Sequence, residues 1–147
     1  HHTKLMAELA RRFGAEPTVP ELDETSPRSL LALACDNAAE GCVRETFGAL
    51  VASYQATHAE DADVRAQLAL IAEDETRHAQ LSWDIDAWAQ HQLSAPQRVS
   101  VQAARRRALE TLREEVLSPP DADVARAAGL PPPHVASAML NALFAEV

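Results

Sequence analysis

Two segments of the sequence place carboxylate and imidazole side chains at spacings that suit metal binding. Glu75 and His78 lie three residues apart, so on a helix both side chains would project from one face. Glu40 lies earlier, in a segment whose apolar residues also recur at helical spacing. Carboxylates and imidazoles are common ligands of iron and manganese. We therefore take Glu40, Glu75 and His78 as candidate metal ligands.

The helical phase of each segment predicts which carboxylates are buried. At about 100° per residue, Glu40 falls in the middle of an apolar stripe, and Glu45 falls on the opposite, solvated side. Glu75 and His78 likewise share an apolar stripe. A buried carboxylate needs a partner. The alternatives to a metal ion are an ion pair between Glu40 and Arg44 and a hydrogen bond between Glu75 and His78.

The register of the two segments strengthens the metal interpretation. We expect both to be long helices joined by a turn near residue 59. At about 1.5 Å per residue, Glu40, Glu75 and His78 each lie roughly 24–29 Å from that turn. In an antiparallel hairpin the three side chains would therefore face one another at one height.

Glycine, proline and capping residues divide the chain into helices, and no strand pattern occurs. We expect an all-α, single-domain protein. Its predicted parts are the end of an N-terminal bundle helix (1–14), an extended crossover (15–26), a helix hairpin (27–92) and C-terminal helices (96–147). Ser26 and Pro27 are predicted to begin the hairpin and Asp61 to cap its second helix, while Gly14 and Gly129 are expected to end helices.

A second apolar face is predicted on the second helix of the hairpin. Leu70, Leu81 and Trp88 share a side of that helix away from Glu75. We expect the C-terminal helices to cover this face, through Leu109, Leu112 and Leu140.

The candidate ligands lie in two motifs that resemble a known family. The segments 40–46 (EGCVRET) and 71–83 (IAEDETRHAQLSW) are similar to those of bacterial ferritin-like domain proteins of unassigned function. These proteins are related to rubrerythrins within the ferritin-like di-iron carboxylate superfamily. The resemblance implies a ferritin-like antiparallel bundle of four helices that holds two iron or two manganese ions.

The family pattern assigns roles to residues of this chain. It implies that Glu40 is the metal ligand of the third bundle helix, and that Glu75 and His78 are those of the fourth. His2 has the phase of the second helix's histidine ligand, although His1 and His2 also fit the remnant of a purification tag. Two further residues are implied to support the ligands, namely Asp74 and Arg44.

The same pattern implies that the first bundle helix is missing from this sequence. We expect either an N-terminal segment preceding residue 1 or a second subunit of a homo-oligomer to complete the bundle. The implied activity is oxidation of Fe(II), removal of peroxide or oxidation of a substrate with dioxygen. The alternatives are a storage subunit and a non-catalytic scaffold or binding module that has lost its metal. No CxxC pair is present for a rubredoxin-type centre.

Composition and charge argue against several other classes of function. The formal net charge of −9 disfavours a nucleic-acid partner, and we expect Arg105, Arg106 and Arg107 to form a solvated face. No apolar run is long enough to predict a membrane span. Cys35 and Cys42 would lie about 10 Å apart on one helix, beyond disulfide reach. This fits a reducing compartment and favours the cytoplasm.

Overall fold

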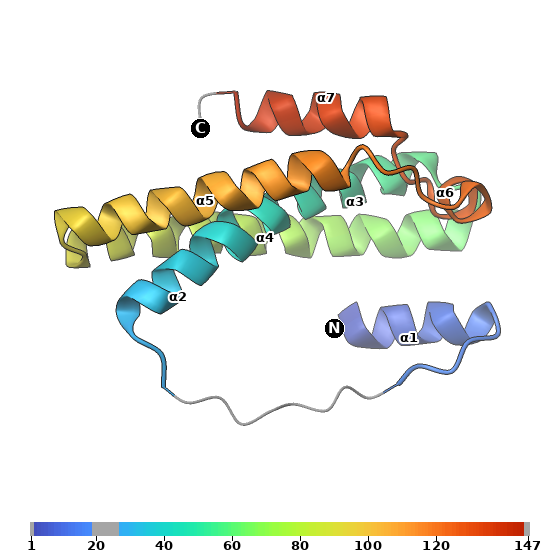
Figure 1. Ribbon diagram of the computed structural model, residues 1–147. Coiled ribbons are helices and arrows are strands. Elements are labelled where there is room, and N and C mark those ends of the chain that lie inside the picture. Colours follow the sequence, from blue (N-terminus) through green and yellow to red (C-terminus); the bar gives the residue numbers. More distant parts are fainter. Residues whose placement is uncertain (1, 19–26, 146–147) are drawn as a thin grey trace.

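The computed structural model describes residues 2–18 and 27–145, and these residues form helices and no strand (Figure 1). The elements in chain order are α1 (His2–Arg12), α2 (Leu30–Asp36), η1 (Asn37–Glu45), α3 (Thr46–His58), α4 (Ala62–Gln92), α5 (Ala95–Glu115), α6 (Ala122–Ala128) and α7 (Pro133–Leu143). The all-α prediction is thus confirmed for the described residues. None of the helices in these two ranges combines the length and hydropathy that a bilayer crossing requires.

The helix hairpin is the frame of the molecule. α2, η1 and α3 follow one another along one arm, and α4 returns against them as the second arm. Asp61 caps α4 as predicted, because its carboxylate accepts hydrogen bonds from the backbone N–H groups of Asp63 and Val64 at 2.8 and 3.1 Å. The predicted span of the second helix is also confirmed, since α4 ends at Gln92.

The predicted start of the hairpin at Pro27 is wrong. The first arm begins at Leu30, and its N-cap is Ser29, whose hydroxyl accepts a hydrogen bond from Ala32 N–H at 3.2 Å. Serine is a good N-cap wherever the chain before it is extended, and the structure shows that Ser29 takes this role. The predicted cap, Ser26, lies outside the described residues, as do His1 and the crossover residues 19–26.

The first arm is not a uniform α-helix. Its middle third, η1, is a π-helix with wider i→i+5 turns. Each residue of a π-helix rotates less about the axis than a residue of an α-helix does, so the phase falls behind α-helical spacing along η1. A phase counted at about 100° per residue therefore drifts along this stretch.

The C-terminal helices pack mainly on the first arm, although Val101 and Arg105 of α5 also reach α4. α5 packs on α2 and η1, and α7 packs on α3. Leu109, Leu112 and Leu140 do lie in one core cluster, but they pack with Val43 and Phe47 of the first arm. The predicted cover over Leu70, Leu81 and Trp88 is therefore wrong, and Leu81 and Trp88 are 57% and 56% exposed. Helical phase could show that α4 has a second apolar face, but it could not show on which arm of the hairpin the later helices pack.

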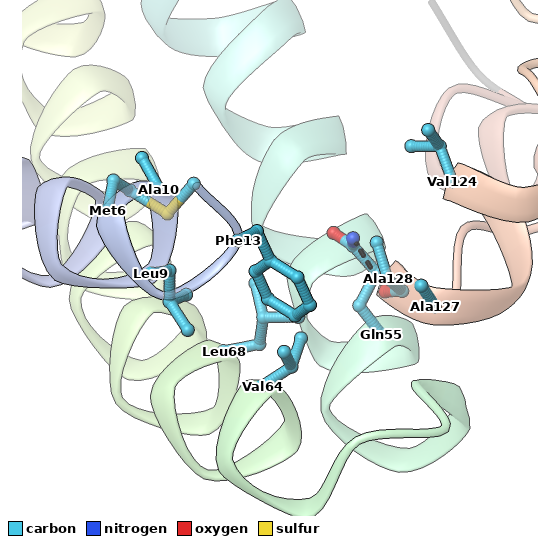
Figure 2. Close-up of a pocket in the computed structure, with 10 residues that line it drawn as sticks. All are labelled: Met6, Leu9, Ala10, Phe13, Gln55, Val64, Leu68, Val124, Ala127 and Ala128. Carbon is cyan, nitrogen blue, oxygen red and sulfur yellow. Dashed lines mark hydrogen bonds between the residues drawn. The ribbon is translucent and has the colours of Figure 1, made fainter. Parts of the chain in front are cut away.

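The ends of the short helices bring distant parts of the chain together. Gly129 ends α6 in the left-handed conformation (φ +66°), as the sequence predicted. A side-chain Cβ at this position would lie 2.2 Å from the backbone nitrogen of Ala59, so α6 closes directly over the α3–α4 turn. Between α6, α1 and the hairpin lies a pocket of about 440 Å³ (Figure 2). Its lining is apolar apart from Gln55, which donates a hydrogen bond to the carbonyl of Ala128.

Candidate metal centre

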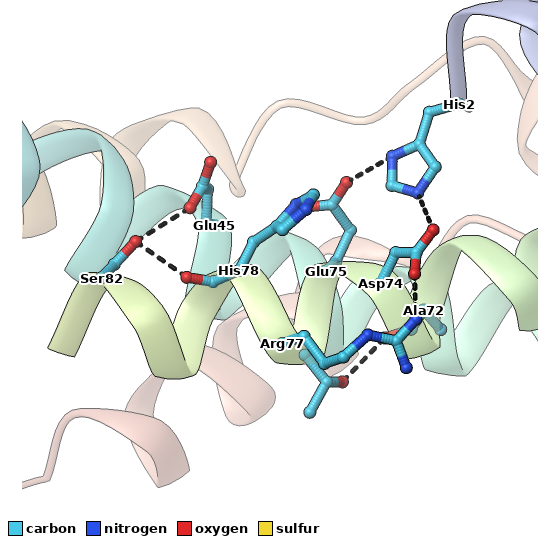
Figure 3. A network of polar contacts seen from close by, with 9 residues as sticks. His2, Glu45, Ala72, Asp74, Glu75, Arg77, His78 and Ser82 are labelled. Carbon is cyan, nitrogen blue, oxygen red and sulfur yellow. Dashed lines mark hydrogen bonds and ion pairs between the residues drawn. The ribbon is translucent and has the colours of Figure 1, made fainter. Parts of the chain in front are cut away.

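Four of the predicted site residues meet where α1 crosses α4 (Figure 3). His2 Nδ1 lies 2.9 Å from Glu75 Oε1, and His2 Nε2 lies 3.0 Å from Asp74 Oδ2. On the other side of Glu75, His78 Nδ1 lies 3.5 Å from Oε2. The two imidazole rings are 5.8 Å apart, centre to centre. The carboxylate of Glu75 is therefore flanked by two imidazoles that come from two different helices.

Local structure explains how α1 presents His2 to α4. α1 runs antiparallel to α4, because Arg12 at its C-terminal end binds Asp61 at the N-terminal end of α4, with an ion pair of 2.6 Å. Leu9 packs on the apolar cluster of Val64 and Leu68 between these ends. With the far end of α1 held in this way, His2 reaches α4 at the level of Asp74 and Glu75.

Asp74 is held in its ionised form. The guanidinium of Arg77, one turn along α4, forms an ion pair with it, and His2 contacts its other oxygen. Both hydrogen bonds, that of Arg77 first, lower the pKa of Asp74 from its usual value. Asp74 thus offers His2 a charged acceptor that can hold the imidazole ring in one orientation.

Glu40 does not join this cluster, so its predicted place on the buried face is wrong. Its side chain is 72% exposed and forms an ion pair of 3.8 Å with Arg44, the alternative partner that the sequence left open. Its neighbour Gly41 lies against α4 instead, since a Cβ at this position would lie 2.4 Å from the hydroxyl oxygen of Ser82. Glu40 is therefore level with residues near Trp83, roughly 12 Å beyond Glu75 at 1.5 Å per residue.

The prediction that Glu45 is solvated is also wrong. Its carboxylate accepts a hydrogen bond of 3.0 Å from the Ser82 hydroxyl on α4, one turn after His78, and Figure 3 shows it pointing toward α4. Glu45 follows Gly41 by four residues and therefore lies on the same side of the arm, whereas Glu40 lies about 100° away from Gly41.

Arg44 supports a different contact from the one implied by the resemblance. Its guanidinium binds both carboxylate oxygens of Glu115 on α5, at 2.8 and 2.9 Å. This pairing raises the pKa of Arg44 and lowers that of Glu115. Arg44 therefore ties η1 to α5 and lies apart from the cluster around Glu75.

A polar pair that sequence analysis missed lies in the core, further along α4. Arg105 was expected in a solvated run, but its side chain is buried and binds Asp86 at 2.7 Å, with the guanidinium over the ring of Trp83. Helical phase could have separated Arg105 from its neighbours Arg106 and Arg107. The buried acceptor on α4 could not have been found without the fold.

The fit of these residues to a metal ion is partial. Within residues 2–18 and 27–145, no group of three or more histidine, cysteine, aspartate or glutamate side chains has its donor atoms converged on one point. The chemistry of His2, Glu75 and His78 does suit a transition metal. The described residues do not fit the four-ligand, two-metal set, because Glu40 lies elsewhere.

No family model matches this chain, and neither does any curated protein or any solved structure.

Proposed function

We propose that this chain is a ferritin-like helical protein that binds one divalent transition-metal ion, iron or manganese, through His2, Glu75 and His78. The observation that carries the proposal is the carboxylate of Glu75, within 2.9 and 3.5 Å of the two imidazoles. Two imidazoles and one carboxylate with open positions are the donor set of many non-haem Fe(II) sites. Asp74 would hold the outer nitrogen of His2, as carboxylates commonly do for histidine ligands.

Binding at this site would exchange protons for the metal. The ring nitrogens of His2 and His78 lie 2.9 and 3.5 Å from the Glu75 carboxylate, and a cation would bind these same atoms. His78 is 53% exposed, so its ring has room to turn its nitrogen toward an ion beside Glu75. Metal affinity should therefore fall as the solution is acidified, because protons compete for the same nitrogen and oxygen atoms.

The reaction that we propose for the iron form is oxidation of Fe(II), or turnover of peroxide or dioxygen. Bound iron would supply the redox chemistry, and the residues of the chain would hold it and leave it accessible. The exposure of His78 leaves a path for a small oxidant to reach the site. A second metal ion would need further ligands, which would have to come from a segment or subunit that completes the bundle.

The second candidate function is a non-catalytic scaffold or binding module. It is favoured by Glu40, which is exposed and bound to Arg44 instead of facing the cluster. Under this alternative, the contacts of Glu75 with His2 and His78 are internal ion pairs that fasten α1 to α4. Such a protein would keep its helices and bind no metal.

Isothermal titration with Mn(II) separates the two candidates. We expect about one ion per chain for the unaltered protein and none for Glu75→Gln. Glu73→Gln is the matched control, because Glu73 is an exposed carboxylate on the same helix, and it should bind Mn(II) normally. Glu40→Gln should also bind normally, whereas the two-metal pattern of the family requires it to lose binding.

Fe(II) oxidation under air, followed by absorbance on the same four proteins, tests the activity. Normal Mn(II) binding without any Fe(II) oxidation would refute the oxidoreductase proposal and leave the metal site standing. Absence of Mn(II) binding in the unaltered protein would refute the metal site and favour the scaffold.

A further inference from the structure

α4 carries an exposed apolar stripe along its C-terminal half. Leu81, Ile85 and Trp88 follow one another at helical spacing, and all three are exposed. Leu70 extends the same side of the helix toward its N-terminus. Single exposed apolar residues are ordinary, but a continuous row of large ones usually marks an interface.

The stripe adjoins an interface that the fold already uses. α1 packs antiparallel on α4, and its first described residue, His2, contacts Asp74 at the edge of the stripe. Beyond this contact Leu81 and Trp88 remain exposed among the described residues. α1 therefore packs as an antiparallel neighbour on one part of α4, and the uncovered part of α4 could accept another antiparallel helix in the same way.

The polar residues on the stripe are arranged to match a second copy of the same stripe. Its N-terminal half carries the exposed guanidinium of Arg77, and its C-terminal half carries Asp84 and the indole of Trp88. Antiparallel pairing of two identical helices brings the N-terminal half of each against the C-terminal half of the other. Arg77 would then meet a carboxylate and an aromatic face, both of which attract a guanidinium. Parallel pairing would instead place Arg77 against Arg77.

We propose that this stripe is the interface of a homodimer in which the two α4 helices pack antiparallel about a two-fold axis near Ser82 and Trp83. In this register Arg77 lies opposite Trp88 of the second copy, and Leu81 lies beside its symmetry mate close to the axis.

The dimer does not depend on the proposed metal, so the two ideas can fail separately. Sedimentation equilibrium in the presence of EDTA, from about 1 to 500 µM protein, should show a reversible monomer–dimer equilibrium, as expected for a small interface. Leu81→Arg and Arg77→Glu should each shift the protein to monomer over this range. Leu117→Arg changes an equally exposed leucine outside the stripe and should leave the equilibrium unchanged.

Circular dichroism of each variant shows whether it has kept its helices, which exposed positions should tolerate. A monomer at every concentration would overturn the dimer and leave the stripe to a different partner. A dimer that survives Leu81→Arg would show that the copies associate elsewhere and would overturn this interface. An Arg77→Glu dimer as tight as that of the unaltered protein would overturn the antiparallel register.

Discussion

The close approach of Gly41 to Ser82 is the contact that excludes Glu40 from the cluster, and a single methyl group tests it. A Cβ on Gly41 would lie 2.6 Å from the Cβ of Ser82 and 2.4 Å from its hydroxyl oxygen. Gly48, one to two turns further along the same arm, has no heavy atom within 4 Å of the corresponding position. Gly41→Ala and Gly48→Ala therefore add the same atom to the same helix hairpin, in a tight and in an open site.

The two substitutions should change the free energy of unfolding in opposite directions. Replacing glycine by alanine within a helix stabilises it by about 0.5–1 kcal/mol, and this is the whole effect that we expect at Gly48. At Gly41 the two arms must separate by about 0.8 Å to restore an ordinary 3.4 Å contact, and overpacking of this kind costs about 1–3 kcal/mol. The net expectation for Gly41→Ala is a loss of about 1–2 kcal/mol, a fall in Tm of roughly 2–8 °C for a chain of this size.

Urea unfolding followed by circular dichroism at 222 nm measures both variants against the unaltered protein. Ser82→Gly in the Gly41→Ala background should recover part of the loss, because it removes the atoms that the new methyl group meets. Equal stabilisation by Gly41→Ala and Gly48→Ala would refute the close approach. The register that places Glu40 away from Glu75 would then be refuted with it.

Two further predictions concern the buried polar and thiol groups. Asp86→Ala leaves the guanidinium of Arg105 buried without its carboxylate and should lower the free energy of unfolding in urea by about 3–5 kcal/mol. Replacing both residues, by leucine and methionine, should lower it much less. Equal losses in the two proteins would contradict a buried pair. Burial raises the pKa of the Cys42 thiol to about 11, so iodoacetamide at neutral pH should label Cys35 in the native protein and reach Cys42 only after unfolding. Because the native thiol keeps its proton above the unfolded value of 9.0, stability should fall as the pH rises from about 9 to about 11, and Cys42→Ala should flatten that fall.

The local signals of the sequence determined the helices and most of their ends. Asp61 and Gly129 act through hydrogen bonds and backbone conformations within a few residues of themselves, so their roles could be recognised without the fold. The spacing of Glu75 and His78 likewise follows from the geometry of one helix. These features were predicted correctly because nothing distant competes with them.

The tertiary structure decided which carboxylates come together. Helical phase placed Glu40 inside and Glu45 outside, but in the structure Gly41 lies against Ser82, so that Glu45 reaches α4 and Glu40 does not. Along η1 each residue also rotates less about the axis than an α-helical residue does, so a phase counted at about 100° per residue drifts there. Periodicity counted at one fixed angle does not show which side of the arm meets α4.

The partners of long-range contacts were decided in the same way. The sequence showed that α4 has a second apolar face. In the structure α5 and α7 pack mainly on the first arm of the hairpin, and Leu81 and Trp88 on that face remain exposed to solvent. Arg105 is buried because it pairs with Asp86 and stacks on Trp83, both of which belong to α4. Burial of apolar area is favourable on many surfaces, and a buried charge needs a partner; only the three-dimensional packing of the helices determines which surface and which partner these are.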